Sequence, residues 1–354
     1  NTKTEQSQLL DRSHIIHQDG MTLTGDTIYY DKANEYGRCI GHIESVDSAN
    51  QMTLFGNRGE VWENGHRAYV TDSAMMLEWS DTTDLTYMHA DSLWAEEIPF
   101  TTYSLIERDS ILVDSVMTAQ MPDTIWRDTT YQQLRAFHNV RIFRSDMQAV
   151  CDSARYHGKD SILTLFGLPI CWNEDNQLSA DQIDVYIKNQ EVDYMHGVGN
   201  AIAIKREGIE EFNQLAGKEM FAYVRDRDIY LVDVQGNAET VFYPQEDDGT
   251  YIGVNRTQSS FVKLYLKDRK IDYVLFTTAT TGVMIPLDQA LENERKLSGF
   301  FWAEEERPHS PEDIFSHPPR TVRPVAGTVS AAAEDEEEAE EDEEENKATR
   351  RQNR

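Results

Sequence analysis

The residues best suited to chemistry in this sequence are aspartates that recur at the start of a short repeated pattern. An aspartate is followed by apolar residues two and four positions further on at Asp26, Asp72, Asp91, Asp152 and Asp181. A row of carboxylates could bind a metal ion or act in acid–base catalysis, but one aspartate at the start of each strand is also what Asx-turn capping produces. We therefore interpret these aspartates as strand caps.

Other signatures of catalysis are weak. Gly197-Val-Gly199 lacks the third glycine of a dinucleotide-binding loop, no nucleophile elbow, Walker loop or His-Glu-x-x-His motif occurs, and only His14 and His17 lie close together among ten histidines. A glycosidase needs only two carboxylates, so an enzyme stays open as a minor alternative in a chain with 63 acidic residues. The sequence favours a protein that is not an enzyme and has no cofactor or metal site.

The three cysteines show no zinc-binding spacing. Cys39, Cys151 and Cys171 are odd in number, so at most one disulfide can form within the chain. Small buried side chains are the simpler interpretation.

The charge and composition limit the partners. Hydrophobic residues make up 39% of the chain, which is enough for a core, and the formal net charge is −30. Such a charge disfavours a nucleic-acid partner, because affinity for phosphates comes largely from lysine and arginine. No apolar run is long enough for a transmembrane helix. The first residue is Asn1 and no leader pattern follows it, which suggests a signal peptide already removed.

The repeated pattern predicts an all-β protein. Its third and fifth residues share one side of an extended strand, because side chains alternate between faces. Turn residues such as those of Glu63-Asn64-Gly65 separate the predicted strands. The spacing between copies is uneven, which disfavours a regular β-helix and favours an elongated β-jelly roll of one module or of two or more.

The chain divides into four predicted regions. We expect an N-terminal β-module at 1–96, an inserted loop, partial hairpin or hinge at 97–131, and a second β-region at 132–302 with one short helix near 286–297. A proline-rich and acidic tail follows at 303–354 and is expected to be disordered, since it cannot bury enough apolar surface. Its acidic run is either a solvated spacer or a docking segment for a basic surface.

Several copies of the pattern resemble a known family. The segments 25–31, 41–47 and 138–142 resemble the OstA-like family, which includes periplasmic lipopolysaccharide-transport proteins, and the segments 146–153 and 176–181 are similar to its longer members from Bacteroidota. The resemblance covers roughly residues 15 to 302. It implies a β-jelly roll with an apolar trough for acyl chains and with end strands that pair with partner jelly rolls. The acidic tail is not part of the family pattern.

The candidate lipid-binding residues are the third and fifth positions of the copies. They are Ile28, Tyr30, Ala74, Met76, Leu93, Ala154, Tyr156, Ile183 and Val185. Each buried methylene of an acyl chain contributes about 0.8 kcal/mol, so an apolar trough needs no salt bridge, and anionic headgroups should protrude from this acidic body. The alternative is that these side chains fill a closed core.

The resemblance implies a function in the cell envelope. We expect non-enzymatic binding of lipopolysaccharide, or of a similar acylated glycolipid, and its transport across the periplasm toward the outer membrane. The expected partners are other jelly-roll transport proteins, and the expected location is periplasmic or associated with the outer membrane. The alternative is a β-rich scaffold that pairs through its edge strands without carrying lipid.

Overall fold

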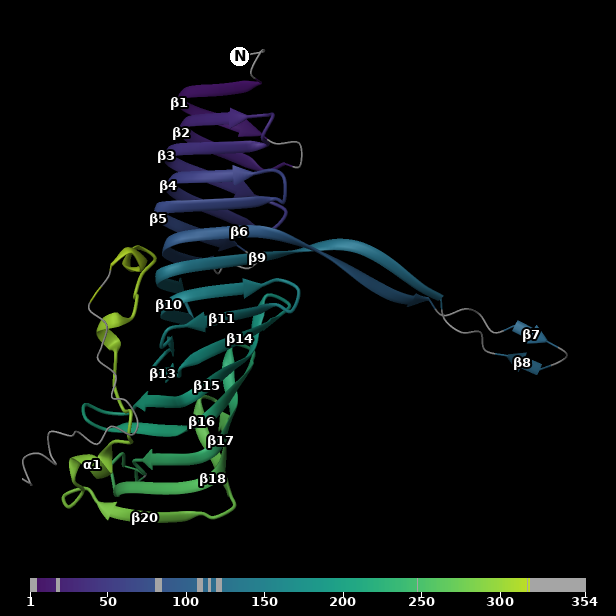
Figure 1. The fold of residues 1–354 in the computed structure, drawn as a ribbon. Helices are drawn as coiled ribbons and strands as arrows, with labels where there is room; N and C mark the ends of the chain where they lie inside the picture. The colour runs from purple at the N-terminus through teal and green to yellow at the C-terminus, as the bar shows by residue number, and fades with distance from the viewer. Residues whose placement is uncertain are drawn as a thin grey trace, which may run out of the picture.

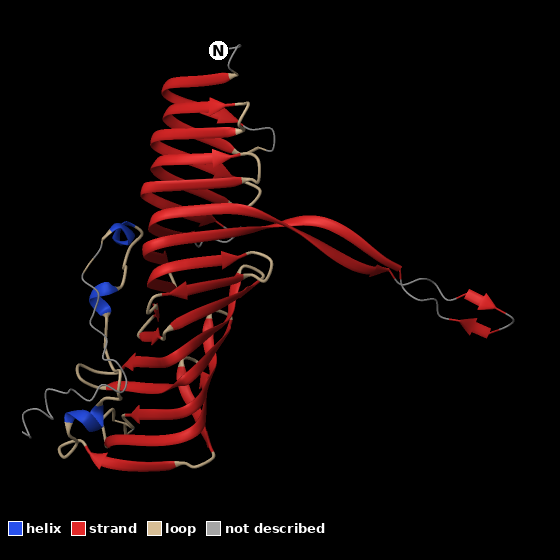
Figure 2. Ribbon diagram, in the orientation of Figure 1, coloured by secondary structure: helices blue, strands red, loops and turns tan. Residues whose placement is uncertain are grey.

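The protein is one long antiparallel β-structure. The computed structural model describes residues 5–16, 20–79, 85–106, 111–113, 116–118, 123–246, 248–316 and 318. Eighteen strands form one sheet, and β7 and β8 form a second sheet of two strands. Figure 1 and Figure 2 show the strands stacked along the length of the molecule. The prediction of an all-β fold is confirmed.

The strands of the first half are β1 (Gln6–Ile16), β2 (Thr22–Asp31), β3 (Tyr36–Asp47), β4 (Met52–Trp62), β5 (Arg67–Trp79), β6 (Leu85–Ile106), β7 (Ile111–Val113), β8 (Val116–Thr118), β9 (Asp123–Arg144) and β10 (Met147–His157). The second half contains β11 (Ile162–Phe166), β12 (Ile170–Asn173), β13 (Asn176–Ser179), β14 (Gln182–Lys188), β15 (Glu191–Arg206), β16 (Phe212–Arg225), β17 (Asp228–Phe242), β18 (Gly253–Lys267), β19 (Lys270–Thr277) and β20 (Thr281–Pro286). Three short helical turns follow: α1 (Glu292–Arg295), η1 (Glu304–Glu306) and η2 (Glu312–Phe315).

The long strands bend sharply at their middle. The register shifts by skipped residues in the pairings of β1 to β6 and again in those of β15 to β18. Two successive residues adopt the left-handed conformation at many of these bends, as at Gly41 and His42 or Gly199 and Asn200. Because a bulge bends its strand, the stacked bends form a corner that runs along the molecule.

The corner divides the sheet into two walls. Wall A comprises 6–10, 27–31, 36–40, 58–62, 67–71, 92–98, 131–137, 153–157, 162–166, 182–188, 191–198, 219–225, 228–235, 261–267 and 270–277. Wall B comprises 13–16, 22–24, 43–47, 52–55, 74–79, 85–89, 141–144, 147–151, 170–173, 176–179, 201–206, 212–216, 238–242, 253–259 and 281–286. Leu93 and Ile183 of wall A share one buried cluster with Met88 and Leu178 of wall B. The sheet is thus folded over on itself as an elongated β-jelly roll.

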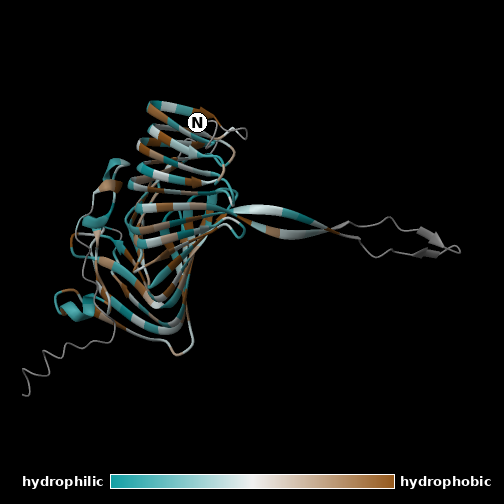
Figure 3. Ribbon diagram, turned by 45° about the horizontal axis from the view of Figure 1, so that its top comes forward, coloured by the Kyte–Doolittle hydropathy of each residue, from teal (hydrophilic) through white to brown (hydrophobic). Residues whose placement is uncertain are grey.

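The hydropathy alternates along the strands, as Figure 3 shows. In wall A, the paired residues Val185 and Met195 are buried. The next pair on the same two strands, Tyr186 and Tyr194, is half-exposed. This period of two gives each wall an apolar inner face and a mixed outer face.

The region expected as an inserted loop or hinge is a β-ribbon. β6 and β9 pair from Tyr87↔Phe143 out to Ile106↔Asp123, and their distal halves project from the body as an arm. The two strands also pair within both walls, at Met88↔Ile142 and Leu93↔Ala136. The sheet therefore continues past the insertion, which does not divide it into halves.

The C-terminal segment forms a strap along the outer face of wall B. The expected helix at 286–297 is limited to Glu292–Arg295, since Pro286 still pairs in β20 and Leu297 is buried against wall B. Residues 303–316 continue over the same face, with Ala303, Glu306 and Ile314 buried. The folded part thus extends beyond the expected boundary at 302. The rest of the expected disordered tail, 317 and 319–354, lies outside the described residues.

Candidate functional site: the apolar interior and its corner

The recurring aspartates lie at the corner. Asp26, Asp91 and Asp152 occupy the middle of β2, β6 and β10, and only Asp181 directly precedes a strand. The interpretation as caps at strand starts was therefore wrong for most copies. The pattern marks the bend of a longer strand, and the two residues that it selects follow that bend.

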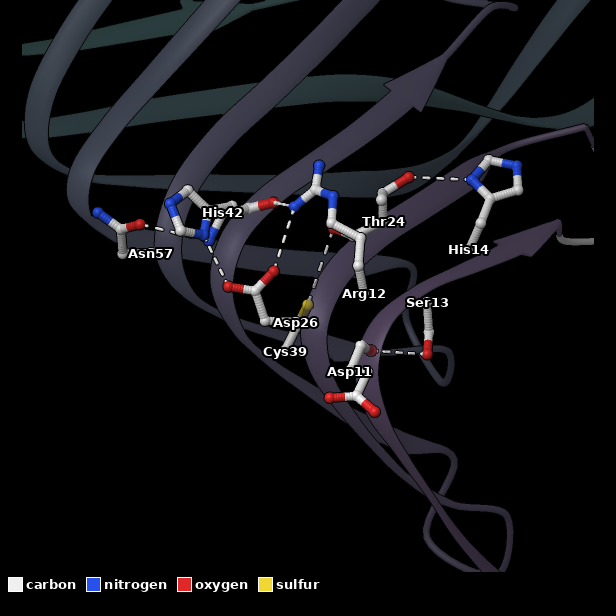
Figure 4. A network of polar contacts seen from close by, with 9 residues as sticks. All are labelled: Asp11, Arg12, Ser13, His14, Thr24, Asp26, Cys39, His42 and Asn57. Atoms are coloured by element: carbon white, nitrogen blue, oxygen red, sulfur yellow. Dashed lines mark hydrogen bonds and ion pairs between the residues drawn. The ribbon is translucent and has the colours of Figure 1, made fainter.

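The Asp26 carboxylate shows what these aspartates do (Figure 4). It accepts a hydrogen bond from Arg12 at 3.4 Å, and its Oδ2 lies 2.6 Å from Nδ1 of His42. The backbone N–H of His42 donates to Asn57 Oδ1 at 3.3 Å. The hydrogen bond with His42 is the main cause that lowers the pKa of Asp26 from its ordinary value of 3.8. The carboxylate thus ties the left-handed bend of the next strand to its own strand.

The same arrangement recurs along the corner. Asn139 Nδ2 donates to both oxygens of Asp91 at 3.1 Å, Asn200 Nδ2 donates to Asp181 at 3.0 Å, and His138 lies 3.2 Å from Asp152. These contacts are structural and join Asp91, Asp152 and Asp181 to the bend of a neighbouring strand. Asp72 differs, because it lies within the bend of β5 and has a φ of +59° itself. Among the described residues, no group of three or more histidine, cysteine, aspartate or glutamate side chains could hold a metal ion.

The remaining chemical candidates are also structural. Gly197 lies within β15, where a Cβ would approach Ala201 and Ala180 at 3.3 and 3.4 Å, so it is not part of a loop for phosphates. His14 bonds Thr24, and His17 lies outside the described residues. All three cysteines are buried and free, and burial raises the pKa of Cys39 to about 11 and that of Cys171 to about 12. Their interpretation as small buried side chains is confirmed.

The nine candidate lipid contacts all face the interior. Ile28, Leu93, Ala154 and Ile183 belong to one cross-strand row of wall A, which the pairings continue through Cys39, Val70, Ala136, Leu165, Met220, Val234 and Val262. Tyr30, Tyr156 and Val185 belong to the adjacent row, nearer the strand ends. We call these two rows the inner rows of wall A.

The other two candidates lie across the interior. Ala74 and Met76 belong to wall B, because β5 runs opposite to β2 and passes the corner before it reaches them. The structure therefore brings seven candidates together on one wall and two on the facing wall. Ile28, Ala74, Met76, Leu93, Ala154, Ile183 and Val185 are at most 7% exposed, while Tyr30 and Tyr156 are half-buried.

Sequence reasoning missed most of the inner rows. Cys39, Val70 and Ala136 stand on strands that approach the corner from the other direction, where no aspartate precedes them. Their own alternation of buried and exposed neighbours was the available signal, for example in β3 and β5.

Polar contacts join the two walls along the edge opposite the corner, where the turns of both walls lie. We call this edge the seam. Arg269 of a wall A turn bonds Asp228 at 2.8 Å and also pairs with Glu174 of a wall B turn, and Gln190 bonds Gln51 at 3.2 Å. Half-buried apolar side chains lie beneath it, including Met52, Ala95, Met147, Leu163, Ile187 and Val192.

Both ends of the large sheet leave a strand edge uncovered within the described part of the chain. β1 pairs with β2 alone, and β19 and β20 pair with β18 alone. Apolar side chains are exposed there, with Leu10 at 67% and Ile16 at 70% on β1, and Leu275 and Met284 near half exposed on β19 and β20.

No family model matches this sequence, and no curated protein matches it. No helix among the residues that the structure describes is long and apolar enough to cross a membrane. Fold and site define a class: an elongated all-β jelly roll with a continuous apolar interior and uncovered strands at both ends.

Proposed function

We propose that this protein is an OstA-like carrier that binds the acyl chains of lipopolysaccharide, or of a similar acylated glycolipid, between its walls. It passes them along the roll toward the outer membrane and catalyses no reaction. The observation that supports this proposal is the continuity of the inner rows from β2 to β19. A chain moving from strand to strand would exchange one set of apolar contacts for a similar set.

The walls pack closely, so an acyl chain would enter by parting the seam. The contacts that cross the seam are made by exposed side chains, and exposed ion pairs contribute only about 0–1 kcal/mol each. An acyl chain that replaces contacts between the walls keeps the same apolar surface buried. Burial of apolar surface contributes about 25 cal/mol per Å², so this stabilisation is retained. The anionic headgroups would stay outside, because they are repelled by this acidic body.

Photocrosslinking from matched positions tests the proposal. Tyr156 of an inner row and Tyr186 of the outer face stand on neighbouring parts of wall A, since Tyr156 pairs with Leu163 and Leu163 with Val185. Each is replaced by benzoylphenylalanine, and the purified chain is irradiated with purified lipopolysaccharide. We expect a crosslinked glycolipid from position 156 and none from position 186. Equal yields, or no product from position 156 in a folded variant, would rule out the interior as the binding site.

The uncovered end strands support a second candidate, a scaffold that joins envelope proteins by edge pairing. Exposed strand edges recruit further strands in many assemblies. The same crosslinking experiment separates the two functions, because a scaffold would retain its partners while position 156 stays free of lipid.

A further inference from the structure

The two outer faces of the roll differ in what covers them. The strap lies on wall B, where Phe301 and Ala303 join Val150, Ile170 and Trp172 in a buried cluster. On wall A, strands β3 to β10 carry five arginines beside several aromatic rings and two glutamates. We call this surface the arginine face; it consists of Arg38, Arg58, Glu60, Trp62, Arg67, Tyr69, Trp94, Glu96, Arg135, Phe137 and Arg155.

The arginine face has more cations than its own carboxylates pair. Arg135 bonds Glu96, and Arg58 lies 3.9 Å from Glu60. Arg135 and Arg155 stand directly opposite each other on β9 and β10, which is unfavourable for like charges. Among the described residues, Arg38 and Arg155 form no ion pair, although the chain holds 63 acidic and 33 basic residues. An anionic group placed here would relieve the repulsion.

The aromatic rings give this surface the composition of an interface. Trp62 and Trp94 have centroids 5.5 Å apart, Tyr69 lies 6.1 Å from Trp94, and the Arg67 guanidinium lies 5.6 Å from the Trp62 ring. Tryptophan, tyrosine and arginine are the residues that most often dominate binding energy at interfaces. Phe137 is 40% exposed beside them.

We propose that the arginine face is the docking site of the chain's own acidic segment, residues 334–345, in which eleven of the twelve residues are glutamate or aspartate. Arginine binds carboxylates through two parallel hydrogen bonds and so suits such a segment better than lysine would. The docked segment would cover the outer face of wall A, as the strap covers that of wall B. This inference does not depend on lipid binding.

The strap brings the chain to the right strands. Its last turn, η2, contacts β6 and β9, and the Phe315 ring lies 4.7 Å from the His89 ring. β6 continues from His89 around the corner to Trp94, a distance of about 17 Å along five residues. The residues between 316 and 334 span up to about 60 Å when extended, which is ample for this path. Covalent attachment raises the local concentration of the acidic segment to about the millimolar range.

Two exposed phenylalanines provide a matched test. Phe137 lies on the arginine face, and Phe261, 45% exposed, lies in the same outer row at the far end of wall A. Each is replaced by benzoylphenylalanine in the full chain, and crosslinked peptides are identified by mass spectrometry on an equal mixture of isotopically light and heavy protein. We expect a crosslink from position 137 into 334–345 within one chain and at least fivefold less from position 261.

The electrostatic basis is tested on the same variant. The crosslinking yield from position 137 should fall severalfold in about 0.5 M salt, where the Debye length is only about 4 Å. It should fall similarly with Arg155→Gln and stay unchanged with Arg225→Gln, an exposed arginine at the other end of wall A. Circular dichroism confirms that each variant is folded.

Three results would overturn the inference. They are equal crosslinking from both positions, a yield that neither salt nor Arg155→Gln changes, and crosslinks that join light to heavy chains. Capture of a co-purified anionic glycan at position 137 in place of the segment would assign the arginine face to that ligand and would also reject self-docking.

Discussion

At the scale of single residues, the residues of the corner determine where each strand bends. A sheet of bent strands needs residues that accept the left-handed conformation and a partner that holds them there. Gly41 and His42 supply the first, and Asp26 of the preceding strand supplies the second. Asp26, Asp91, Asp152 and Asp181 therefore act as cross-strand clamps, whereas Asp72 is itself a left-handed residue of the bend.

Gly41 should tolerate no side chain. Its φ is +81°, and a Cβ there would lie 2.5 Å from Asp26 Oδ2. We expect Gly41→Ala to lower the free energy of unfolding by about 2–4 kcal/mol, as backbone strain adds to the clash. Gly249→Ala is the control, since Gly249 has a φ of +84° but no atom within 4 Å of the added Cβ. Urea denaturation measures both, and equal losses would contradict a role for the close approach.

The Asp26 clamp should make stability depend on pH. Its folded-state pKa lies below 3.8 because His42 and Arg12 bind the carboxylate, so its stabilisation is present above that value and is lost as pH falls through the lower, folded pKa. We expect Asp26→Asn to lower the melting temperature at neutral pH and to converge with the unmodified chain as pH falls through the lowered, folded-state pKa of Asp26. Asp11→Asn, at an exposed position of the same corner, should not change the curve. A pH-independent difference for Asp26→Asn would exclude the charge as the cause.

The sequence predicted the interior better than it predicted the corner. Alternation alone placed Ile28 and Ile183 on inner faces, because a period of two depends only on local geometry. It could not show that Asp26 sits inside a strand, because the bulge shifts the alternation by one residue: Leu23 and Ile28 both face the interior although they are five positions apart. In the sequence, this shift looks like the start of a new strand. It also could not separate Ala74 from Ile28, which requires the strand direction.

At the scale of elements, the strap shows how tertiary contacts override local composition. Proline and glutamate predicted disorder after residue 302, yet buried polar side chains of wall B hold this backbone. Gln177 donates to Phe301 O at 2.9 Å and accepts from Ala303 N–H at 2.9 Å, and Arg141 donates to Glu306 O at 2.6 Å. Gln177 and Arg141 stand on strands more than a hundred residues before the strap, so no local pattern could reveal these contacts.

Gln177 should anchor the strap. Gln177→Leu keeps the volume but leaves a buried N–H and a buried C=O of the strap unpaired, at a cost of about 1–3 kcal/mol each. We expect a lower melting temperature and faster hydrogen exchange at 301–306. Gln258→Leu, on an exposed site of wall B, is the control. If exchange at 301–306 is the same in both variants, the strap does not depend on Gln177.

At the scale of the whole molecule, the sheet is a stack without an internal boundary and with two uncovered ends. Each added strand pairs with the previous one and buries its inner face against the facing wall. Apart from the arm of β6 and β9, the described sheet lacks a second neighbour at β1 and at the pair β19 and β20. Proteins that have uncovered edge strands and do not aggregate usually protect these edges with charged residues, proline or a covering segment. Here exposed apolar residues such as Leu10 and Leu275 stand at the edges beside only a few charged ones.

The two ends should therefore pair with each other in concentrated solution. A head-to-tail contact of this kind does not close, so it predicts linear oligomers that grow with concentration in sedimentation velocity. Proline at Ser7 and at Gln8 tests the contact, because successive N–H groups along β1 point alternately toward β2 and away from it. One of the two variants should lose a bond to β2 and melt earlier, while the other should keep its stability and stop assembling. Pairing through β1 would be contradicted by a chain that stays monomeric at all concentrations. It would also be contradicted if the variant that keeps its stability still assembles.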